Sequence, residues 1–243
     1  MERIDEVNDR LKLIQRTDGL TFGTDALLLA GYISGKHRRG IELGGGTGII
    51  SMLLLAREKV GEALAVEVQP EYVELIRRNA ELNSLDTLGA VCADVRDYRP
   101  EWEADVVYTN PPYMKVDSGK ANLTDAKNMA RHEVMGDIGD FCRAAKRMLR
   151  YGGRFAAVYR PDRLVDLIFE MREAGLEPKR MTFVHADAEA EPSMVLVEAR
   201  ADGKSGMLLT RPLLIYADKA HREYGEDMKY IMENGDFPAG FKR

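Results

Sequence analysis

The chain has 243 residues, of which 45% are hydrophobic and 31% charged, and its formal net charge is −5. These values fit one soluble α/β domain with extensions better than two domains, and neither a signal peptide nor a membrane span is evident. A cytoplasmic location is therefore expected. Cys92 and Cys142 lack metal-ligand spacing, so we expect two buried, reduced thiols and neither a disulfide nor a metal site.

The charge balance bears on the class of partner. A net negative chain is a poor candidate for coating nucleic acid non-specifically, because that requires a concentrated basic face. Between Lys115 and Arg180, however, Lys and Arg outnumber Asp and Glu. A focal RNA-contact surface and a set of solvated helix faces are both compatible with this asymmetry.

The first 36 residues predict an N-terminal extension of the domain. Leu11–Gln15 and Leu20–Phe22 flank Thr17-Asp18-Gly19, a pattern typical of a short hairpin. A helix is expected from Asp25 to Ile33, with Thr24 as its N-cap and Gly35 at its end. The core is expected over 37–201, and 202–243 is expected to be a C-terminal tail packed on it.

From Arg39 onward apolar strands alternate with helical stretches, which predicts a Rossmann-like, mostly parallel sheet of seven strands flanked by helices. The interval from Met114 to Asp137 is polar and lacks a clear period, which is typical of a functional loop. The expected strands are 40–43, 62–66, 88–92, 105–109, 154–159, 179–184 and 194–199, and the expected helices are 49–57, 71–83, 138–149 and 163–173, with a weak strand at 213–216.

A glycine-rich turn follows the first core strand. Gly44, Gly46 and Gly48 permit close backbone approach to a ligand and backbone conformations closed to other residues. The dinucleotide-binding fingerprint has a third glycine at the position of Ile49, so this turn does not match that fingerprint. The glycines follow an acidic residue, Glu42. This pattern of an acid and three glycines resembles motif I of S-adenosylmethionine-dependent methyltransferases, in which the motif contacts the amino-acid end of the donor.

Acidic residues follow the next two strands. Glu67 is placed to accept hydrogen bonds from both ribose hydroxyls of an adenosine. Asp94 is placed to accept from an adenine amino group, while Val95 packs on the ring and its amide donates to a ring nitrogen. Either acid alone is equally compatible with capping the following helix. Their order at successive strand ends favours a nucleoside site.

Asn110-Pro111-Pro112-Tyr113 follows the fourth core strand and predicts methyl transfer to a planar amide or amino nitrogen. The lone pair of such a nitrogen is delocalised, so the site must accept its hydrogen bonds and hold it in line with the donor. The side-chain carbonyl of Asn110, the backbone carbonyl of Pro111 and the flat ring of Tyr113 offer these functions. A plain strand-to-loop turn is the structural alternative.

The chain resembles the bacterial tRNA1(Val) (adenine-37-N6)-methyltransferase family, a class I S-adenosylmethionine-dependent family with an Asn-Pro-Pro-Tyr motif, and most resembles its Gram-positive branch. The N-terminal match discriminates best. The stretches that carry the resemblance are 11–15, 22–30, 42–50, 110–113, 130–133, 159–164 and 212–216.

The resemblance implies a tRNA substrate and assigns roles to further residues. Thr24 or Asp25 contacts the ammonium or carboxylate of the donor, Glu42 contacts its ammonium directly or through water, and Asn110 serves both donor and acceptor. Lys115, Arg131 and His132 are candidate RNA contacts, although a loop-anchoring salt bridge is the favoured interpretation for the last two. Many methyltransferases have Asp at the position of Glu42, and Thr, Ala or Cys at the position of Gly45, so this sequence departs from the commoner pattern at both positions.

Three alternatives remain open from the residues alone. The same acceptor motif serves glutamine N5-methyltransferases of release factors and adenine N6-methyltransferases of ribosomal RNA or DNA. We expect no N-terminal helical domain of the kind found in the release-factor enzymes, which argues against the first of these. A donor-binding interaction protein without catalysis is the third alternative, and the intact acceptor motif argues against it. The sequence leaves the oligomeric state open.

Overall fold

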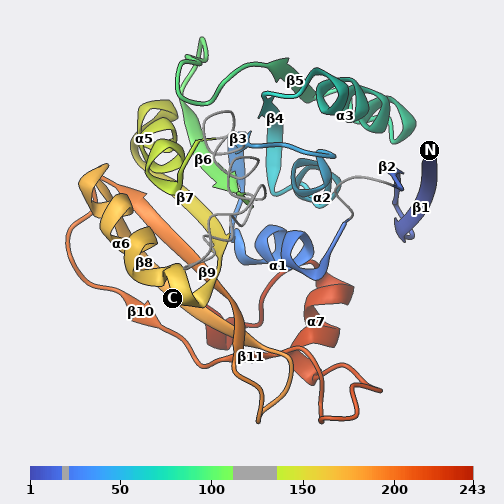
Figure 1. The fold of residues 1–243 in the computed structure, drawn as a ribbon, viewed down its shortest axis with the longest axis vertical. Helices are drawn as coiled ribbons and strands as arrows, with labels where there is room; N and C mark the ends of the chain where they lie inside the picture. Colours follow the sequence, from blue (N-terminus) through green and yellow to red (C-terminus); the bar gives the residue numbers. More distant parts are fainter. Residues whose placement is uncertain (18–21, 112–135, 243) are drawn as a thin grey trace, which may run out of the picture.

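A computed structural model describes residues 1–17, 22–111 and 136–242 of the chain. A central sheet is covered by helices on both faces, and a separate two-stranded hairpin lies beside it near the N-terminus (Figure 1). In the hairpin, β1 (Glu2–Asn8) pairs antiparallel with β2 (Leu11–Arg16). This α/β arrangement confirms the predicted fold class.

The sheet has nine strands in the order β10-β8-β9-β7-β6-β3-β4-β5, with β11 also paired to β8. Only β9 runs antiparallel to its neighbours, β7 and β8. The seven long strands are the seven that were predicted, and two strands of two residues widen the edge. Their bounds are β3 His37–Leu43, β4 Val60–Glu67, β5 Leu88–Cys92, β6 Ala104–Thr109, β7 Leu149–Tyr159, β8 Leu176–His185, β9 Pro192–Ala201, β10 Leu208–Leu209 and β11 Leu213–Leu214.

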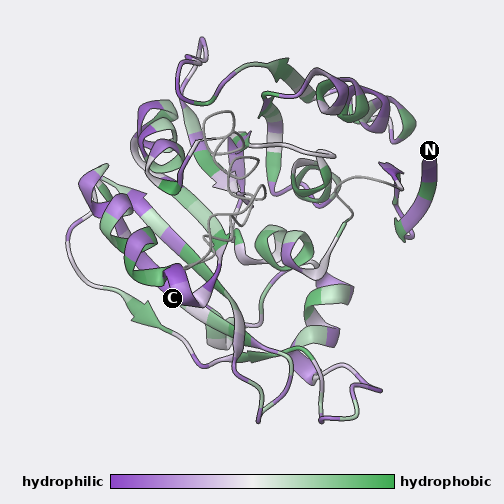
Figure 2. Cartoon of the chain, viewed as in Figure 1, coloured by the Kyte–Doolittle hydropathy of each residue, from purple (hydrophilic) through white to green (hydrophobic). Residues whose placement is uncertain are grey.

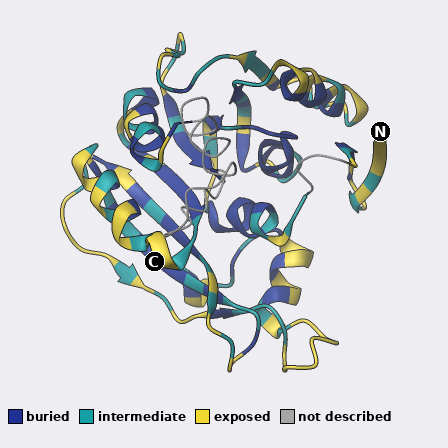
Figure 3. Cartoon of the chain, in the orientation of Figure 1, coloured by how far each residue is buried: buried dark blue, intermediate teal, exposed yellow. Residues whose placement is uncertain are grey.

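Helices cover the two faces of the sheet in separate groups. Successive residues of a strand point to opposite faces. In β4, Ala63 and Ala65 belong to a hydrophobic cluster that includes residues of α1, α2, α3 and α7, whereas Val66 belongs to a second cluster that includes residues of α5 and α6. Helices α3, α5, α6 and α7 have an apolar, buried inner surface and a more polar, exposed outer surface, whereas α1 and α2 are mostly apolar and buried (Figures 2 and 3). The helices are α1 Thr24–Tyr32, α2 Ile49–Ala56, α3 Pro70–Leu82, α5 Ile138–Met148, α6 Leu164–Glu173 and α7 Glu226–Asn234, with 3₁₀ turns η1 Pro161–Arg163 and η2 Ala239–Phe241.

The hairpin differs from the one predicted. Leu11–Gln15 does form a strand, but its partner is Glu2–Asn8 and the chain reverses at Asp9–Arg10. β1 is mostly exposed, so it carries little hydrophobic signal. It is held by main-chain pairing and by an Arg78–Glu2 ion pair of 2.7 Å from α3. The predicted partner, Leu20–Phe22, lies mostly outside the described part of the chain.

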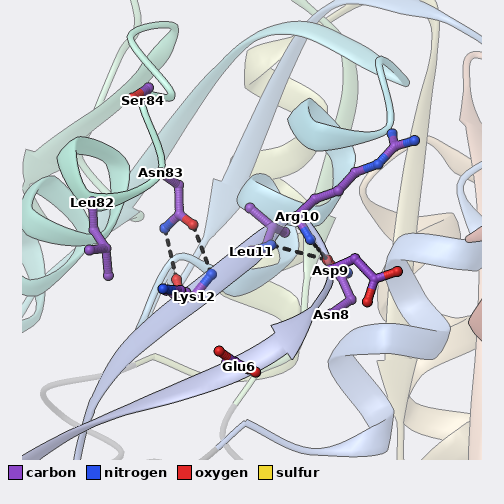
Figure 4. Close-up of a pocket in the computed structure, with 9 residues that line it drawn as sticks. All are labelled: Glu6, Asn8, Asp9, Arg10, Leu11, Lys12, Leu82, Asn83 and Ser84. Carbon is purple, nitrogen blue, oxygen red and sulfur yellow. Dashed lines mark hydrogen bonds between the residues drawn. The ribbon is translucent and has the colours of Figure 1, made fainter.

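Asparagine side chains of α3 pair with the other edge of β2. Asn83 accepts from the Lys12 amide (2.8 Å) and donates to the Lys12 carbonyl (2.7 Å), at the rim of an open groove between hairpin and helix (Figure 4). One turn earlier, buried Asn79 makes the same pair of bonds with Ile14 (2.7 and 3.1 Å). The two amides thus substitute for a neighbouring strand and dock the hairpin on the core.

Two local predictions were wrong. Gly23, not Thr24, is the N-cap of α1, and Thr24 is the exposed first residue of the helix. Cys142 is buried, and burial raises the pKa of its thiol to about 12, but Cys92 is exposed at the end of β5. Burial of Cys92 was expected as the default for a cysteine without metal-ligand spacing, whereas the position of β5 at the sheet edge leaves Cys92 exposed.

Candidate active site

Four parallel strands deliver the predicted site residues to one edge of the sheet. β6, β3, β4 and β5 are consecutive neighbours, and their carboxyl ends lead into Asn110, the glycine turn (residues 44–48), Glu67 and Asp94 respectively (Figure 1). The carboxyl edge of a parallel sheet is the usual location of ligand sites in this architecture. The predicted donor and acceptor residues therefore lie at a common edge.

The glycine turn depends on left-handed backbone at three positions. Gly44, Gly46 and Gly48 have φ values of +71°, +53° and +79°, and Gly48 is the N-cap of α2. Gly45 has a steric requirement instead, because a Cβ there would lie 3.0 Å from both the Ala65 Cβ and the Ile76 Cδ1. The departure at Gly45 noted in the sequence is thus explained by close packing of the turn on β4 and α3.

Glu67 supports the glycine turn directly. Its Oε2 accepts from the Gly46 amide at 3.0 Å, its Oε1 accepts from the Gln69 amide at 2.9 Å, and the residue is 2% exposed. A carboxylate has about four lone-pair sites, so these two bonds leave acceptor capacity for ribose hydroxyls. Glu67, the proposed acceptor for the ribose hydroxyls, is therefore also a residue that holds the glycine turn in place.

A small cavity adjoins the turn, and it gathers several of the predicted donor residues. Phe141 of α5, which the sequence did not single out, closes one side, with a ring carbon 3.5 Å from where a Gly44 Cβ would lie. Apolar side chains and two carboxylates, the groups that contact a nucleoside, thus line one cavity, whose volume of about 20 Å³ is far smaller than a nucleoside. The lining residues are Gly44, Val66, Glu67, Val68, Asp94, Val95 and Phe141.

Asp94 is already engaged by a neighbouring cation. Its Oδ1 accepts from the Arg96 amide at 2.8 Å, and its two oxygens receive the Arg96 guanidinium. This pairing holds the pKa of Asp94 below its usual value. An adenine amino group at Asp94 would therefore share a carboxylate that Arg96 also binds.

Glu42 lies beneath the glycine turn and is 2% exposed. Its Oε2 accepts from both the amide (3.1 Å) and the hydroxyl (2.5 Å) of Ser51, and the Ser51 hydroxyl lies 2.8 Å from the hydroxyl of Tyr108. Burial raises the pKa of Glu42 to about 8. Desolvation therefore favours the neutral form of this carboxyl in the protein without ligand.

The first residue of the acceptor motif contacts the N-terminal extension. Asn110 donates from Nδ2 to Asp25 Oδ2 at 2.8 Å, which joins two sequence motifs 85 positions apart. A carboxylate only accepts, so this bond directs the amide nitrogen to Asp25 and sets the orientation of the amide. Asp25 in turn accepts from the Ala26 amide at 2.9 Å through Oδ1.

Gly23 leaves the space that Asp25 occupies. A Cβ on Gly23 would lie 2.6 Å from Asp25 Oδ1, although the backbone there is extended and open to any residue. The glycine of the Phe22-Gly23-Thr24-Asp25 stretch is therefore explained by the neighbouring carboxylate.

Not every predicted residue is part of this described geometry. Pro111 is buried next to Asn110, and exposed Thr24 adjoins Asp25. Pro112, Tyr113, Lys115, Arg131 and His132 lie outside the described residues. Ser51, Asn79 and Phe141 join the site without having been predicted. Asn79 is tied to the glycine turn by a 3.0 Å bond to the Thr47 carbonyl.

Among the described residues no group of three or more His, Cys, Asp or Glu side chains is arranged to hold a metal. Over the same residues, no helix combines the length and apolar character needed to cross a bilayer.

Solved structures share this fold. The chain resembles a predicted O-methyltransferase of Agrobacterium tumefaciens with a TM-score of 0.68 and 24% identity, covering 87% of this chain and 96% of that one. A methyltransferase of Pyrococcus furiosus aligns with a TM-score of 0.60 and 17% identity over 82% of this chain and 92% of its own. The fold is that of a class I methyltransferase.

The family follows from the sequence comparisons. The model of the methyltransferase small domain matches residues 17–170, so the chain belongs to the methyltransferase small domain family. Curated relatives agree. A tRNA1(Val) (adenine(37)-N6)-methyltransferase of Phocaeicola vulgatus is 30% identical over 72% of this chain and 74% of its own length. A protein with the same name from a Flavobacteriaceae bacterium is 22% identical over 92% of this chain and 93% of its own.

Proposed function

We propose that this protein transfers the methyl group of S-adenosylmethionine to N6 of adenine 37 in tRNA1(Val) and does so in the cytoplasm. The observation that carries the proposal is the 2.8 Å bond between Asn110 and Asp25, which joins the start of the acceptor motif to the N-terminal stretch that discriminates the family. The names of the relatives supply the tRNA and its position.

The donor is held by the glycine turn and the cavity beside it. Glu67 receives the ribose hydroxyls, Val95 and Phe141 pack on the adenine, and the turn approaches the methionine end. The sulfonium of the donor supplies an activated methyl group. Little acid–base chemistry is then required, and positioning dominates the rate.

Asn110 positions the acceptor. Its side-chain carbonyl accepts a hydrogen bond from the exocyclic amine of adenine and directs the nitrogen lone pair at the methyl carbon. A nitrogen–carbon bond forms as the carbon–sulfur bond breaks, and the proton lost from N6 passes to solvent. Asp25 holds the amide of Asn110 in the required orientation.

The test uses an unmodified tRNA1(Val) transcript, labelled S-adenosylmethionine and mass spectrometry of the digested nucleosides. We expect N6-methyladenosine from this transcript and none from a matched transcript in which adenine 37 is replaced by guanine. Label in a release factor, ribosomal RNA or DNA, with none in tRNA, would contradict the proposed substrate. Donor binding with no transfer to any of them would favour the non-catalytic alternative.

A further inference from the structure

A chain of buried polar groups connects the glycine turn with the strand that carries Asn110. Glu42 is the penultimate residue of β3, Ser51 belongs to α2, and Tyr108 lies in β6 two residues before Asn110. Ser51 and Tyr108 are fully buried, and Glu42 is 2% exposed. Consecutive oxygen–oxygen distances are 2.5 Å from Glu42 to Ser51 and 2.8 Å from Ser51 to Tyr108.

The direction of these hydrogen bonds is fixed when Glu42 is ionised, because a carboxylate only accepts. Ser51 has one hydroxyl proton and donates it to Glu42, so Tyr108 must donate to Ser51. Burial and the nearby Glu42 raise the pKa of Tyr108 well above its usual value, so its hydroxyl keeps the proton needed for this role. The Ser51 amide adds a further donor to Glu42. All donors are thus aligned to support negative charge on Glu42.

The surroundings of Glu42 nevertheless disfavour that charge. The titratable groups around it are Tyr108 on β6 and Glu67 on β4, and the latter raises its pKa further. The buried residues of α1 carry no charged side chain, and Asp25 at its start is another acid. No described Lys or Arg is paired with Glu42. A buried carboxylate in such a position requires a cation, and the methyl donor carries a net positive charge.

We propose that Ser51 and Tyr108 are positioning residues for methyl transfer, which hold Glu42 ready to become the counter-ion of the bound donor and tie the donor turn to the strand that presents Asn110. This inference rests on the proposed function, because it takes S-adenosylmethionine as the ligand. Before binding, the carboxyl of Glu42 is protonated. When the cationic donor binds, the oxygen–hydrogen bond of that carboxyl breaks, Glu42 becomes anionic, and the proton passes to solvent.

The test is a calorimetric titration of the protein with S-adenosylmethionine in two buffers of different ionisation enthalpy, between pH 6 and 7.5. We expect the wild type to release close to one proton per donor bound at pH 7. Glu42→Gln should abolish this release. Because the donor's own amino group titrates near pH 8, the difference between wild type and Glu42→Gln isolates the contribution of Glu42.

Tyr108→Phe separates the positioning role from a structural one. Without the Tyr108 hydroxyl the anion is less well supported, so donor affinity should fall at least threefold at pH 6.5 and recover part of that loss at pH 7.5. Tyr32→Phe is the matched control, since Tyr32 is equally buried and its hydroxyl bonds Thr182 elsewhere in the same core. It should leave the pH dependence of donor affinity unchanged.

The possible results distinguish a failure of this inference from a failure of the proposed function. Binding of S-adenosylmethionine without proton release would overturn this inference and leave the proposed function intact. A loss of affinity in Tyr108→Phe by the same factor at every pH would reduce Tyr108 to a structural residue. Absence of any donor binding by the wild type would overturn the proposed function and this inference together.

Discussion

At the scale of single residues, Asn110 should separate catalysis from donor binding. Its proposed partner is the acceptor nitrogen, so Asn110→Ala should lower kcat by about 10² or more and change the donor Kd less than threefold. Single-turnover kinetics and calorimetry measure the two quantities. Asn234→Ala, at the far end of α7, is the matched control. Equal losses in both quantities would contradict an acceptor role.

Glu67 should show the opposite behaviour. Glu67→Ala removes the proposed ribose acceptor and the support of Gly46 together, so donor affinity should fall by about 10- to 100-fold, or roughly 1.4 to 2.8 kcal/mol. Glu67→Gln retains a carbonyl acceptor and should lose less. Glu71→Ala, an exposed acid in the first turn of α3, should have no effect. Unchanged donor affinity in Glu67→Ala would count against the ribose role.

Gly23 offers a steric test of the contact between Asp25 and Asn110. A Cβ 2.6 Å from Asp25 Oδ1 must displace that carboxylate, so Gly23→Ala should reduce kcat about tenfold or more while the protein stays folded. Gly240→Ala is the control, because the nearest atom to its Cβ would be Arg211 Nε at 3.8 Å. Full activity of Gly23→Ala would show that Asp25 need not occupy its observed position.

At the scale of elements, the seven long strands and the five helices between residues 24 and 173 of the described chain were predictable, because their apolar periods reflect burial in a layered α/β fold. β1 was not predictable in the same way. Its residues are mostly exposed, and its pairing is set by main-chain bonds with β2 and by an ion pair to α3. The error therefore arose where local hydrophobicity does not determine pairing.

Asn79 gives an element-scale prediction, because it joins the hairpin, α3 and the glycine turn. Asn79→Ala would leave buried groups of Ile14 and Thr47 without this partner, so the free energy of unfolding should fall by about 2 to 3 kcal/mol. Asn83→Ala removes an equivalent but exposed pairing and should cost about 1 kcal/mol. Urea denaturation measures both. Equal costs would contradict the importance of burial at Asn79.

At the scale of the whole molecule, the site could be predicted in its parts but not in its connections. The glycine turn, Glu67, Asp94 and Asn110 each follow a strand, so strand order alone brought them to one edge. The bond from Asn110 to Asp25 spans 85 positions, and the polar chain from Glu42 through Ser51 to Tyr108 joins three elements. Such contacts depend on how elements pack, which a local pattern does not encode.

Two buried groups with opposite charges in their ionised forms should give the stability of the ligand-free protein an unusual pH dependence. Burial raises the pKa of Glu42 from 4.5 to about 8 and lowers that of Lys59 from 10.5 to about 8. The stabilising contribution of neutral Glu42 is complete below pH 4.5 and is lost as the pH rises to 8. For Lys59, the unfolded chain binds the extra proton between pH 8 and 10.5, so stability rises over that window.

These opposite slopes predict a local minimum in the free energy of unfolding near pH 8. His37, whose pKa is lowered by burial, opposes the Glu42 slope only below about pH 6.5. Denaturation from pH 6.5 to 9.5 measures the curve. Each pH unit of a fully developed slope corresponds to about 1.4 kcal/mol. Glu42→Gln should flatten the limb below pH 8, and Lys59→Met should flatten the limb above it. A wild-type curve without a minimum would show that at least one of the two groups keeps a pKa near its ordinary value.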